Sequence, residues 1–262
     1  MIDTHTHLYP SDSFPGDEAA LAIRRAIEAG VDRMILPNVD VASLAPIEAM
    51  QQLFPENVFI APGIHPTELS DCWPDDLKEI EAHISHSGVV AIGEVGIDLY
   101  WDASRREAQI EAFAAQLELA AAKSLPVLIH QRAALQDTLA TLAAADLKRI
   151  PTIVFHCFTE GPDSVKAIRE TVPEALFGIG GVCTFKNAGQ LTAAIREIGI
   201  DHIVLETDAP YLAPVPHRGT RNESAYLPLI AAKVADILGF TTSEVNSVTT
   251  RTVESRLLRH SL

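Results

Sequence analysis

The stretch Val89-Val-Ala-Ile-Gly-Glu94 is a short apolar run that ends on a carboxylate. The same pattern recurs along the chain, and an apolar run of this length bounded by turn residues predicts a β-strand each time. The predicted strands cover residues 2–5, 33–37, 58–63, 89–94, 126–130, 152–156, 176–180 and 203–206. Longer stretches with helical spacing lie between them, for example residues 18–29, 104–123, 133–144 and 188–198.

Eight strand–helix units fill a chain of 262 residues, at about 33 residues each, which is the size of a βα unit with its connections. Near-continuous apolar strands are typical of a parallel sheet that is buried on both faces. No linker-like tract interrupts the series. The sequence therefore predicts an α/β fold, a single (β/α)8 TIM barrel over residues 1–262, with one or two closing helices after Gly239.

The charge balance restricts the function. The chain has 20 Lys and Arg against 35 Asp and Glu, a net charge of −15, and 47% of its residues are hydrophobic. This composition excludes a disordered chain, and the acidity counts against a protein that holds duplex DNA by charge alone. A nucleic acid substrate is still compatible with it if metal ions supply the positive charge.

Targeting and redox signals are sparse. The cysteines Cys72, Cys157 and Cys183 form no CxxC pair, and we find no signal-peptide pattern and no uninterrupted apolar run of about 18 residues. We therefore expect a protein of the reducing cytoplasm with no membrane partner. We also expect a monomer, with a weak oligomer as the alternative. Cys157 and Cys183 are expected to be buried thiols.

Side chains that bind metals follow the predicted strands, at the ends where barrel enzymes carry their active sites. His5 and His7 close the first strand, and their spacing puts both imidazoles on one side of an extended chain, where they can reach one ion. The full set at strand ends is His5, His7, His65, Glu94, His130, His156 and Asp208. A hydrogen-bonded pair is the alternative for His5 and His7 taken alone.

Glu94 is expected inside the barrel if Val90 and Ile92 face the interior, because side chains alternate along a strand. A buried carboxylate costs several kcal/mol unless it is paired or coordinated. No Lys or Arg precedes it on its strand. We therefore predict that Glu94 bridges two cations, with a structural ion pair as the alternative.

His130 and His156 repeat one pattern on neighbouring strands, which favours metal ligands over isolated core histidines. Asp208 is predicted to be a ligand and the proton acceptor, so Asp208 and Glu94 are the candidate catalytic residues. Glu206, on the same strand face as Asp208, is expected to support a histidine or arginine, unless it forms a plain salt bridge. Four imidazoles and two carboxylates exceed the ligand set of one catalytic zinc, about three protein groups, and so predict two ions.

These residues lie in blocks that resemble the TatD family of metal-dependent hydrolases. The blocks are Ile2-Asp-Thr-His5-Thr-His7-Leu, Gly63-Ile-His65-Pro, Ala91-Ile-Gly-Glu94-Val-Gly-Ile-Asp98, Pro126-Val-Leu-Ile-His130-Gln-Arg132, His156-Cys-Phe-Thr and Leu205-Glu-Thr-Asp208-Ala-Pro-Tyr211-Leu. The resemblance implies an amidohydrolase-like barrel and a phosphodiesterase that acts on DNA, often as a 3′→5′ exonuclease with Mg²⁺. It also implies metal-ligand roles for His5, His7, Glu94, His130, His156 and Asp208, the six that the strand pattern had already indicated.

The chain departs from the family pattern at several positions. Thr6 stands where the family usually has Cys, Leu99-Tyr100-Trp101 replaces Tyr-Tyr-like residues, Glu160 precedes Gly161, and Ser224 stands where Pro is usual. None of these positions is a proposed ligand. Glu160 and Ser224 therefore bear on substrate preference and not on metal binding.

Residues near the predicted mouth are candidates for substrate contact. Arg132, Arg218 and Arg221 could hold phosphate oxygens, with surface salt bridges as the alternative. Tyr100, Trp101 and Tyr211 could stack on an unpaired base, and packing at the rim is the alternative. His65 is expected to contact substrate or to support a ligand. His83, His86, His202 and His260 are expected on the surface.

Two enzymatic functions and one non-enzymatic function compete. The leading hypothesis is a deoxyribonuclease that uses two divalent ions, Mg²⁺, Mn²⁺ or Zn²⁺, to cleave single-stranded or frayed DNA ends in the 3′→5′ direction. The alternative is an amidohydrolase acting on a small cyclic amide, ester or lactone, which would not need the arginines. A metal-stabilised scaffold or nucleic-acid-binding module is the third. Nitrogen-rich ligation favours Zn²⁺ or Mn²⁺, whereas the resemblance points to Mg²⁺.

Overall fold

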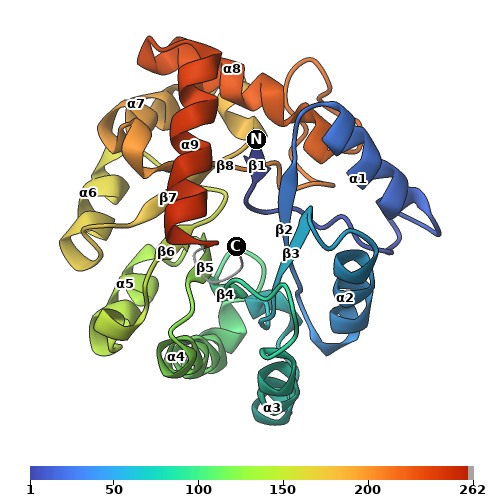
Figure 1. Cartoon of the computed structure of the whole chain (residues 1–262). Helices are drawn as coiled ribbons and strands as arrows, with labels where there is room; N and C mark the ends of the chain where they lie inside the picture. Colours follow the sequence, from blue (N-terminus) through green and yellow to red (C-terminus); the bar gives the residue numbers. More distant parts are fainter. Residues whose placement is uncertain (259–262) are drawn as a thin grey trace.

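The computed structural model describes residues 1–258, which form eight strands with helices between them (Figure 1). Every strand pairing in this part of the chain is parallel. The strands are β1 (Ile2–Asp3), β2 (Arg33–Pro37), β3 (Val58–Ala61), β4 (Ile92–Asp98), β5 (Val127–Arg132), β6 (Ile153–Phe155), β7 (Leu176–Ile179) and β8 (Ile203–Leu205). All eight overlap the strands that the sequence predicts.

Backbone hydrogen bonds close the strands into a barrel. β1–β2–β3 form one ladder and β4 to β8 form another. The Thr4 N–H donates to the Leu205 carbonyl at 3.0 Å, which joins the end of β1 to β8. On the other side, the Val90 N–H donates to the Ile60 carbonyl at 3.0 Å, which joins β3 to the segment before β4. The predicted (β/α)8 barrel is therefore confirmed.

β4 differs most from its prediction, since it begins at Ile92 and not at Val89. Val89 makes only an isolated bridge with Ile60, and the register of β4 on β5 shifts between Ile92 and Val95. Val90 packs in the barrel interior, but Ile92 packs in the outer core under the helices. The condition under which Glu94 is expected inside thus holds for Val90 but not for Ile92, because the register shift breaks the alternation between Ile92 and Glu94; Glu94 is nevertheless buried.

The helices surround the barrel and cover its outer face (Figure 1). In α1, Ala19, Ala22, Ile23 and Ala26 are buried, at the spacing of one helix face. The α-helices in the described residues are α1 (Glu18–Glu28), α2 (Leu44–Leu53), α3 (Trp73–His83), α4 (Arg106–Lys123), α5 (Leu135–Ala144), α6 (Pro162–Thr171), α7 (Gly189–Ile198), α8 (Leu227–Leu238) and α9 (Thr242–Arg256).

α9 closes one end of the barrel and confirms the predicted closing helix. It crosses the barrel in Figure 1 and brings Val253, together with Leu257 and Leu258 beyond its end, against interior residues such as Ile2 and Val204. The carboxyl ends of the strands therefore open at the other end. Within residues 1–258, no single helix is long and apolar enough to cross a membrane; the helical pair at residues 224–238 and 242–256 passes that test only jointly, with a bend of 107°.

Candidate metal centre

The segment after β1 is fixed by the backbone beyond β8. The Asp208 N–H donates to the His5 carbonyl at 2.9 Å, and the His7 N–H donates to the Ala209 carbonyl at 2.7 Å. This pairing continues the ladder past the ends of both strands. It brings His5 and His7 beside Asp208, although about 200 residues separate them in the sequence.

Glu94 lies at the centre of a buried cluster of imidazoles. Its two carboxylate oxygens face different rings, two on the side of Oε2 and three on the side of Oε1. Oε2 lies 3.1 Å from His5 Nε2 and 3.7 Å from His7 Nε2, and Oε1 lies 2.7 Å from His130 Nδ1, 2.8 Å from His156 Nε2 and 3.4 Å from His65 Nε2. One carboxylate thus faces two sets of imidazole nitrogens, the arrangement that a carboxylate between two cations would need.

The charge state of Glu94 follows from these neighbours. Burial alone would raise the pKa of its carboxyl, but the rings of His156, His5 and His65 and the hydrogen bond from His130 outweigh it. They hold the pKa of Glu94 well below its ordinary value. Glu94 is therefore an anion at neutral pH, in a position suited to cations.

The donor set fits divalent cations. His5 Nδ1, His156 Nδ1 and Glu206 Oε2 are buried and have no hydrogen-bond partner among the described residues. In His5 and His156 it is the other ring nitrogen, Nε2, that faces Glu94, so the fit rests on the atoms that do converge there, imidazole nitrogens and carboxylate oxygens, which Zn²⁺ and Mn²⁺ accept. Ligand atoms come within 4.8 Å of one another in three groups: His5, His7 and Glu94; His5, His156 and Asp208; and His65, Glu94 and His130.

His65 lies deeper in the site than the sequence indicates. The sequence predicts that it contacts substrate or supports a ligand, because the six predicted ligands already fill the centre. The structure places it beside Glu94 and His130, with its ring edge-on to that of His130 at 4.4 Å between centroids. Burial lowers the pKa of His65, so the ring is a neutral nitrogen donor.

Asp208 faces the same cluster from the segment directly after β8. Its Oδ1 lies 3.6 Å from His7 Nε2. Burial would raise the pKa of Asp208, but the nearby rings of His7, His156 and His5 lower it below the ordinary value. Asp208 is therefore ionised at neutral pH and can accept a proton.

Asp98 is a site residue whose contact with His130 the sequence did not predict. Its Oδ2 lies 2.9 Å from His130 Nε2, while Nδ1 of the same ring faces Glu94. A carboxylate behind a ligating imidazole orients the ring and raises its basicity. The spacing of Asp98 from Glu94, four residues along one strand, is the signal that could have found it. Gly96 lies between them and pairs with His130, where a Cβ would stand 1.9 Å from the His130 carbonyl oxygen.

Glu206 stands behind His156, in the supporting position that the sequence indicates. Its Oε1 lies 3.4 Å from His156 Nδ1 and accepts the Cys157 backbone N–H. Gly178 makes room for this carboxylate, because a Cβ there would stand 2.1 Å from Glu206 Oε2. Burial would lower the pKa of His156, but Glu94 and Glu206 raise it well above its ordinary value.

The three candidate arginines differ in their surroundings. Arg132 lies over the Tyr100 ring, at 3.9 Å from its guanidinium carbon to the ring centroid, and Arg218 lies over Phe185 at 3.8 Å. Arg221 instead forms ion pairs with Glu18 at 2.7 Å and with Glu223 at 2.9 Å. For Arg221, the structure thus shows the salt bridging that the sequence left open as the alternative.

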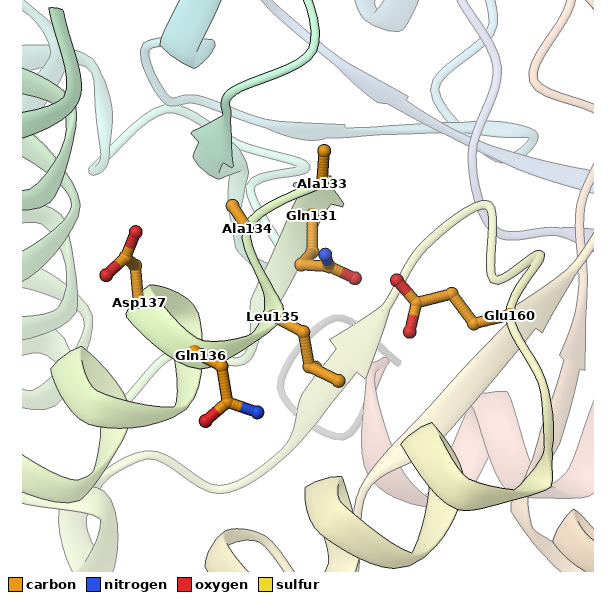
Figure 2. Close-up of a pocket in the computed structure, with 7 residues that line it drawn as sticks. All are labelled: Gln131, Ala133, Ala134, Leu135, Gln136, Asp137 and Glu160. Atoms are coloured by element: carbon orange, nitrogen blue, oxygen red, sulfur yellow. The ribbon is translucent and has the colours of Figure 1, made fainter. Parts of the chain in front are cut away.

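A hollow of about 300 Å³ lies beyond the end of β5, next to the metal centre but outside it (Figure 2). None of the candidate ligands lines it, and Figure 2 shows Gln131 pointing toward Glu160. With its amide oxygen and nitrogen exchanged, Gln131 donates to Glu160 and accepts from the Ala134 and Leu135 N–H groups. Gln131 thus accepts hydrogen bonds from backbone N–H groups at the start of α5. The hollow is lined by none of the candidate catalytic residues.

The three cysteines and the histidines that were predicted on the surface lie outside the candidate ligand set. Cys183 is buried and Cys72 exposed, but Cys157 is only partly buried, contrary to the expectation. The predicted surface histidines His83, His86 and His202 are partly exposed. His260 lies outside the described residues.

Known proteins resemble this chain over its whole length. A family model described as TatD related DNase matches residues 2–257. The uncharacterized metal-dependent hydrolase YabD of Bacillus subtilis is 34% identical over 260 residues, 99% of each chain. A protein named 3′-5′ ssDNA/RNA exonuclease TatD in Pectobacterium parmentieri is 34% identical over 248 residues, covering 91% of this chain and 92% of its own. The crystal structure of the TatD homologue YjjV of Escherichia coli superposes with a TM-score of 0.88 at 26% identity, covering 98% of this chain and 97% of that one.

Proposed function

The chain belongs to the family of TatD-related DNases and is a metal-dependent hydrolase; from that premise we propose that it removes nucleotides from single-stranded or frayed 3′ ends of DNA. The exonuclease named in Pectobacterium supports this direction and substrate. The observation that carries the proposal is the position of Glu94, whose two oxygens face two sets of imidazoles beside the ionised Asp208.

We assign the site two divalent ions. His5 and His7 would hold one together with Glu94, and His65 and His130 the other, again with Glu94, which is common to both groups; His156 and Asp208 form a third group with His5. When bound, such cations lower the pKa of water to give a nucleophile at neutral pH and stabilise charge on a phosphoryl oxygen. Mn²⁺ and Zn²⁺ suit the nitrogen-rich ligands, and Mg²⁺ suits the phosphates of a nucleic acid substrate.

Residues of the chain supply the remaining steps. Asp208 takes the proton from the attacking water, because its lowered pKa keeps it ionised at neutral pH. Asp98 and Glu206 keep the rings of His130 and His156 turned toward Glu94. Arg132 donates hydrogen bonds to a non-bridging phosphate oxygen, which an amidohydrolase acting on a neutral cyclic substrate would not require.

The cell compartment and assembly are part of the proposal. Three free cysteines, one of them exposed, fit the reducing cytoplasm. All the groups assigned here come from one chain, so we propose a monomeric enzyme.

The test combines metal replacement with one substitution. Protein stripped by chelator and given Mg²⁺, Mn²⁺ or Zn²⁺ should shorten a 5′-labelled single strand nucleotide by nucleotide, and the metal content before stripping identifies the resident ion. Asp208→Asn should keep the circular dichroism spectrum and lose about 100-fold in kcat, the magnitude typical of a general base. Asp163→Asn is the control, because Asp163 is an exposed carboxylate on α6.

The outcomes separate the hypotheses. No shortening of the strand with any ion would overturn the nuclease, and hydrolysis of a lactone or cyclic amide in the same assay would favour the amidohydrolase. Wild-type turnover in Asp208→Asn would remove Asp208 from the reaction.

A further inference from the structure

Two aromatic rings stand exposed beside the metal centre. Tyr100 is 60% exposed and Trp101 is 68% exposed, in the segment directly after β4. Their rings meet edge to face, 5.1 Å apart between centroids and at 87°. Large aromatic surfaces held together in water are typical of binding surfaces, since folding alone would bury them.

Arg132 completes this surface. Its guanidinium lies 3.9 Å from the Tyr100 ring centroid and 5.4 Å from that of Trp101. Within residues 1–258 it makes no hydrogen bond or ion pair, although the chain carries 35 carboxylates. The rings therefore fix the guanidinium by cation–π contact while its N–H donors stay free for an anion.

Asp98 connects this surface to the metal centre. Its Oδ1 accepts the N–H groups of Tyr100 and Trp101 at 2.9 and 3.0 Å, and its Oδ2 faces His130 Nε2 at 2.9 Å. Arg132 lies two residues beyond His130 on β5 and pairs with Asp98 across the ladder. A single carboxylate thus orients the histidine and the backbone that carries both aromatic rings.

We propose that Tyr100, Trp101 and Arg132 form a platform for one unpaired nucleobase next to the phosphate that is cleaved. This inference rests on the proposed function and names the residues that bind a base of its single-stranded substrate. Every base has a π-face, so stacking on Trp101 tolerates any sequence, and Arg132 holds the adjoining phosphate. Within a duplex both faces of a base are covered by its neighbours, so the platform selects single-stranded or frayed ends.

The test uses the fluorescence of Trp101. The chain has two tryptophans, Trp73 and Trp101, so Trp73→Phe leaves Trp101 as the only one. A nuclease-resistant phosphorothioate oligonucleotide should quench its emission on binding to the metal-loaded protein. An abasic residue placed in turn at each position from the 3′ end should weaken binding about tenfold at one position and little elsewhere, which locates the stacked base. Equal affinity of all the abasic strands, or unchanged emission on binding, would overturn the platform.

A kinetic test separates the platform from the catalytic proposal. Trp101→Ala should raise KM for a single strand about tenfold and leave kcat/KM for methyl p-nitrophenyl phosphate, a phosphodiester without a base, unchanged. Phe240→Ala is the control, because Phe240 is an aromatic residue, 44% exposed, between α8 and α9. If Trp101→Ala alters neither substrate while the wild type degrades DNA, the platform is wrong and the nuclease stands. If the wild type hydrolyses neither phosphodiester, the nuclease itself fails.

Discussion

Asp3 is the residue that ties the metal centre to the frame of the barrel. Its carboxylate is fully buried and accepts hydrogen bonds from the Thr207 N–H at 3.0 Å, the Thr207 hydroxyl at 2.5 Å, the Ser224 hydroxyl at 2.6 Å and the His5 N–H at 3.3 Å. The Ser224 hydroxyl also lies 3.2 Å from Thr6 Oγ1. Thr6 and Ser224, two positions that depart from the family pattern, thus contact each other, and Ser224 also contacts the buried Asp3.

Burial has a larger effect on Asp3 than its donors do. It raises the pKa of Asp3 from 3.8 to about 7, although the hydroxyls of Ser224 and Thr207 oppose the change. A carboxyl with a raised pKa binds its proton more tightly in the folded chain than in the unfolded one. Its contribution to stability is therefore present below pH 3.8 and is lost as the pH rises to about 7, with a slope of at most about 1.4 kcal/mol per pH unit.

Asp3→Asn removes this ionisation and keeps an acceptor for the His5 and Thr207 N–H groups. We expect the free energy of unfolding of the wild type, relative to the variant, to fall by a few kcal/mol between pH 5 and pH 8. Urea unfolding at both pH values measures this difference, in which the titration of the histidines common to both proteins cancels. The exposed Asp12→Asn should show no such trend, and a constant difference for Asp3→Asn would mean that Asp3 titrates as an ordinary carboxyl.

At this scale, the sequence predicted the residues whose type reveals their chemistry. His5, Glu94 and Asp208 stand out because an imidazole or carboxylate after an apolar run has few structural uses. Asp3 precedes the same His-x-His pair but reads as an ordinary strand residue, because its partners Thr207 and Ser224 lie more than 200 residues away. Side-chain contacts between distant segments cannot be found from spacing alone.

Among the elements, α4 positions two of the site loops. Gln116 accepts the Ile64 N–H at 2.7 Å and donates to the Ile64 carbonyl at 3.2 Å, which fixes the residue before His65. About two turns earlier on the same face of the helix, Gln109 accepts the Asp98 N–H at 2.8 Å and donates to the Asp98 carbonyl at 3.1 Å. Both amides are buried and act as side-chain extensions of the strand ladders.

Gln116→Met should keep the volume of the side chain and remove both hydrogen bonds to Ile64. Each buried backbone group left without a partner costs about 1–3 kcal/mol, so the loss of both bonds should lower the unfolding free energy by about 2–6 kcal/mol. His65 should also lose its fixed position, and KM should change more than the content of bound metal. Thermal unfolding and steady-state kinetics measure these effects. Gln136→Met on the exposed side of α5 is the control, and equal stability of both variants would contradict the role of Gln116.

The sequence predicted the elements well because burial decides them. Apolar runs identify strands that are covered on both faces, so seven strands fall within a few residues of their predicted bounds. Such a run reports burial and not hydrogen bonding, and β4 therefore begins three residues after its predicted start, where the ladder with β5 forms. In α4, Gln109 and Gln116 stand seven residues apart on a buried face, where polar side chains are unusual. The sequence around them does not indicate that their partners are Asp98 and Ile64.

The charge of the whole molecule opposes its proposed substrate. With a net charge of −15, the chain repels a polyanion at long range. Among the described residues beside the candidate metal centre, Arg132 is the cation whose guanidinium forms no ion pair. Phosphate contacts in single strands contribute a slope of about −0.7 each to the dependence of log affinity on log salt. One or two contacts by Arg132 and Arg218 thus give a shallow slope, and screening of the general repulsion flattens it further.

We therefore expect KM for a single-stranded oligonucleotide to rise by no more than about tenfold between 50 and 500 mM monovalent salt at a fixed concentration of the activating metal. Proteins that bind DNA through six to ten phosphate contacts lose far more affinity over a narrower range. Arg132→Gln should raise KM at low salt and flatten the slope by about 0.7, because it removes one phosphate contact. Arg251→Gln changes the net charge equally but lies on α9, at the closed end of the barrel, and should leave the slope unchanged. A steep slope in the wild type, or equal effects of the two variants, would mean that the overall field of the protein, and not a cation at the metal centre, governs how the strand is bound.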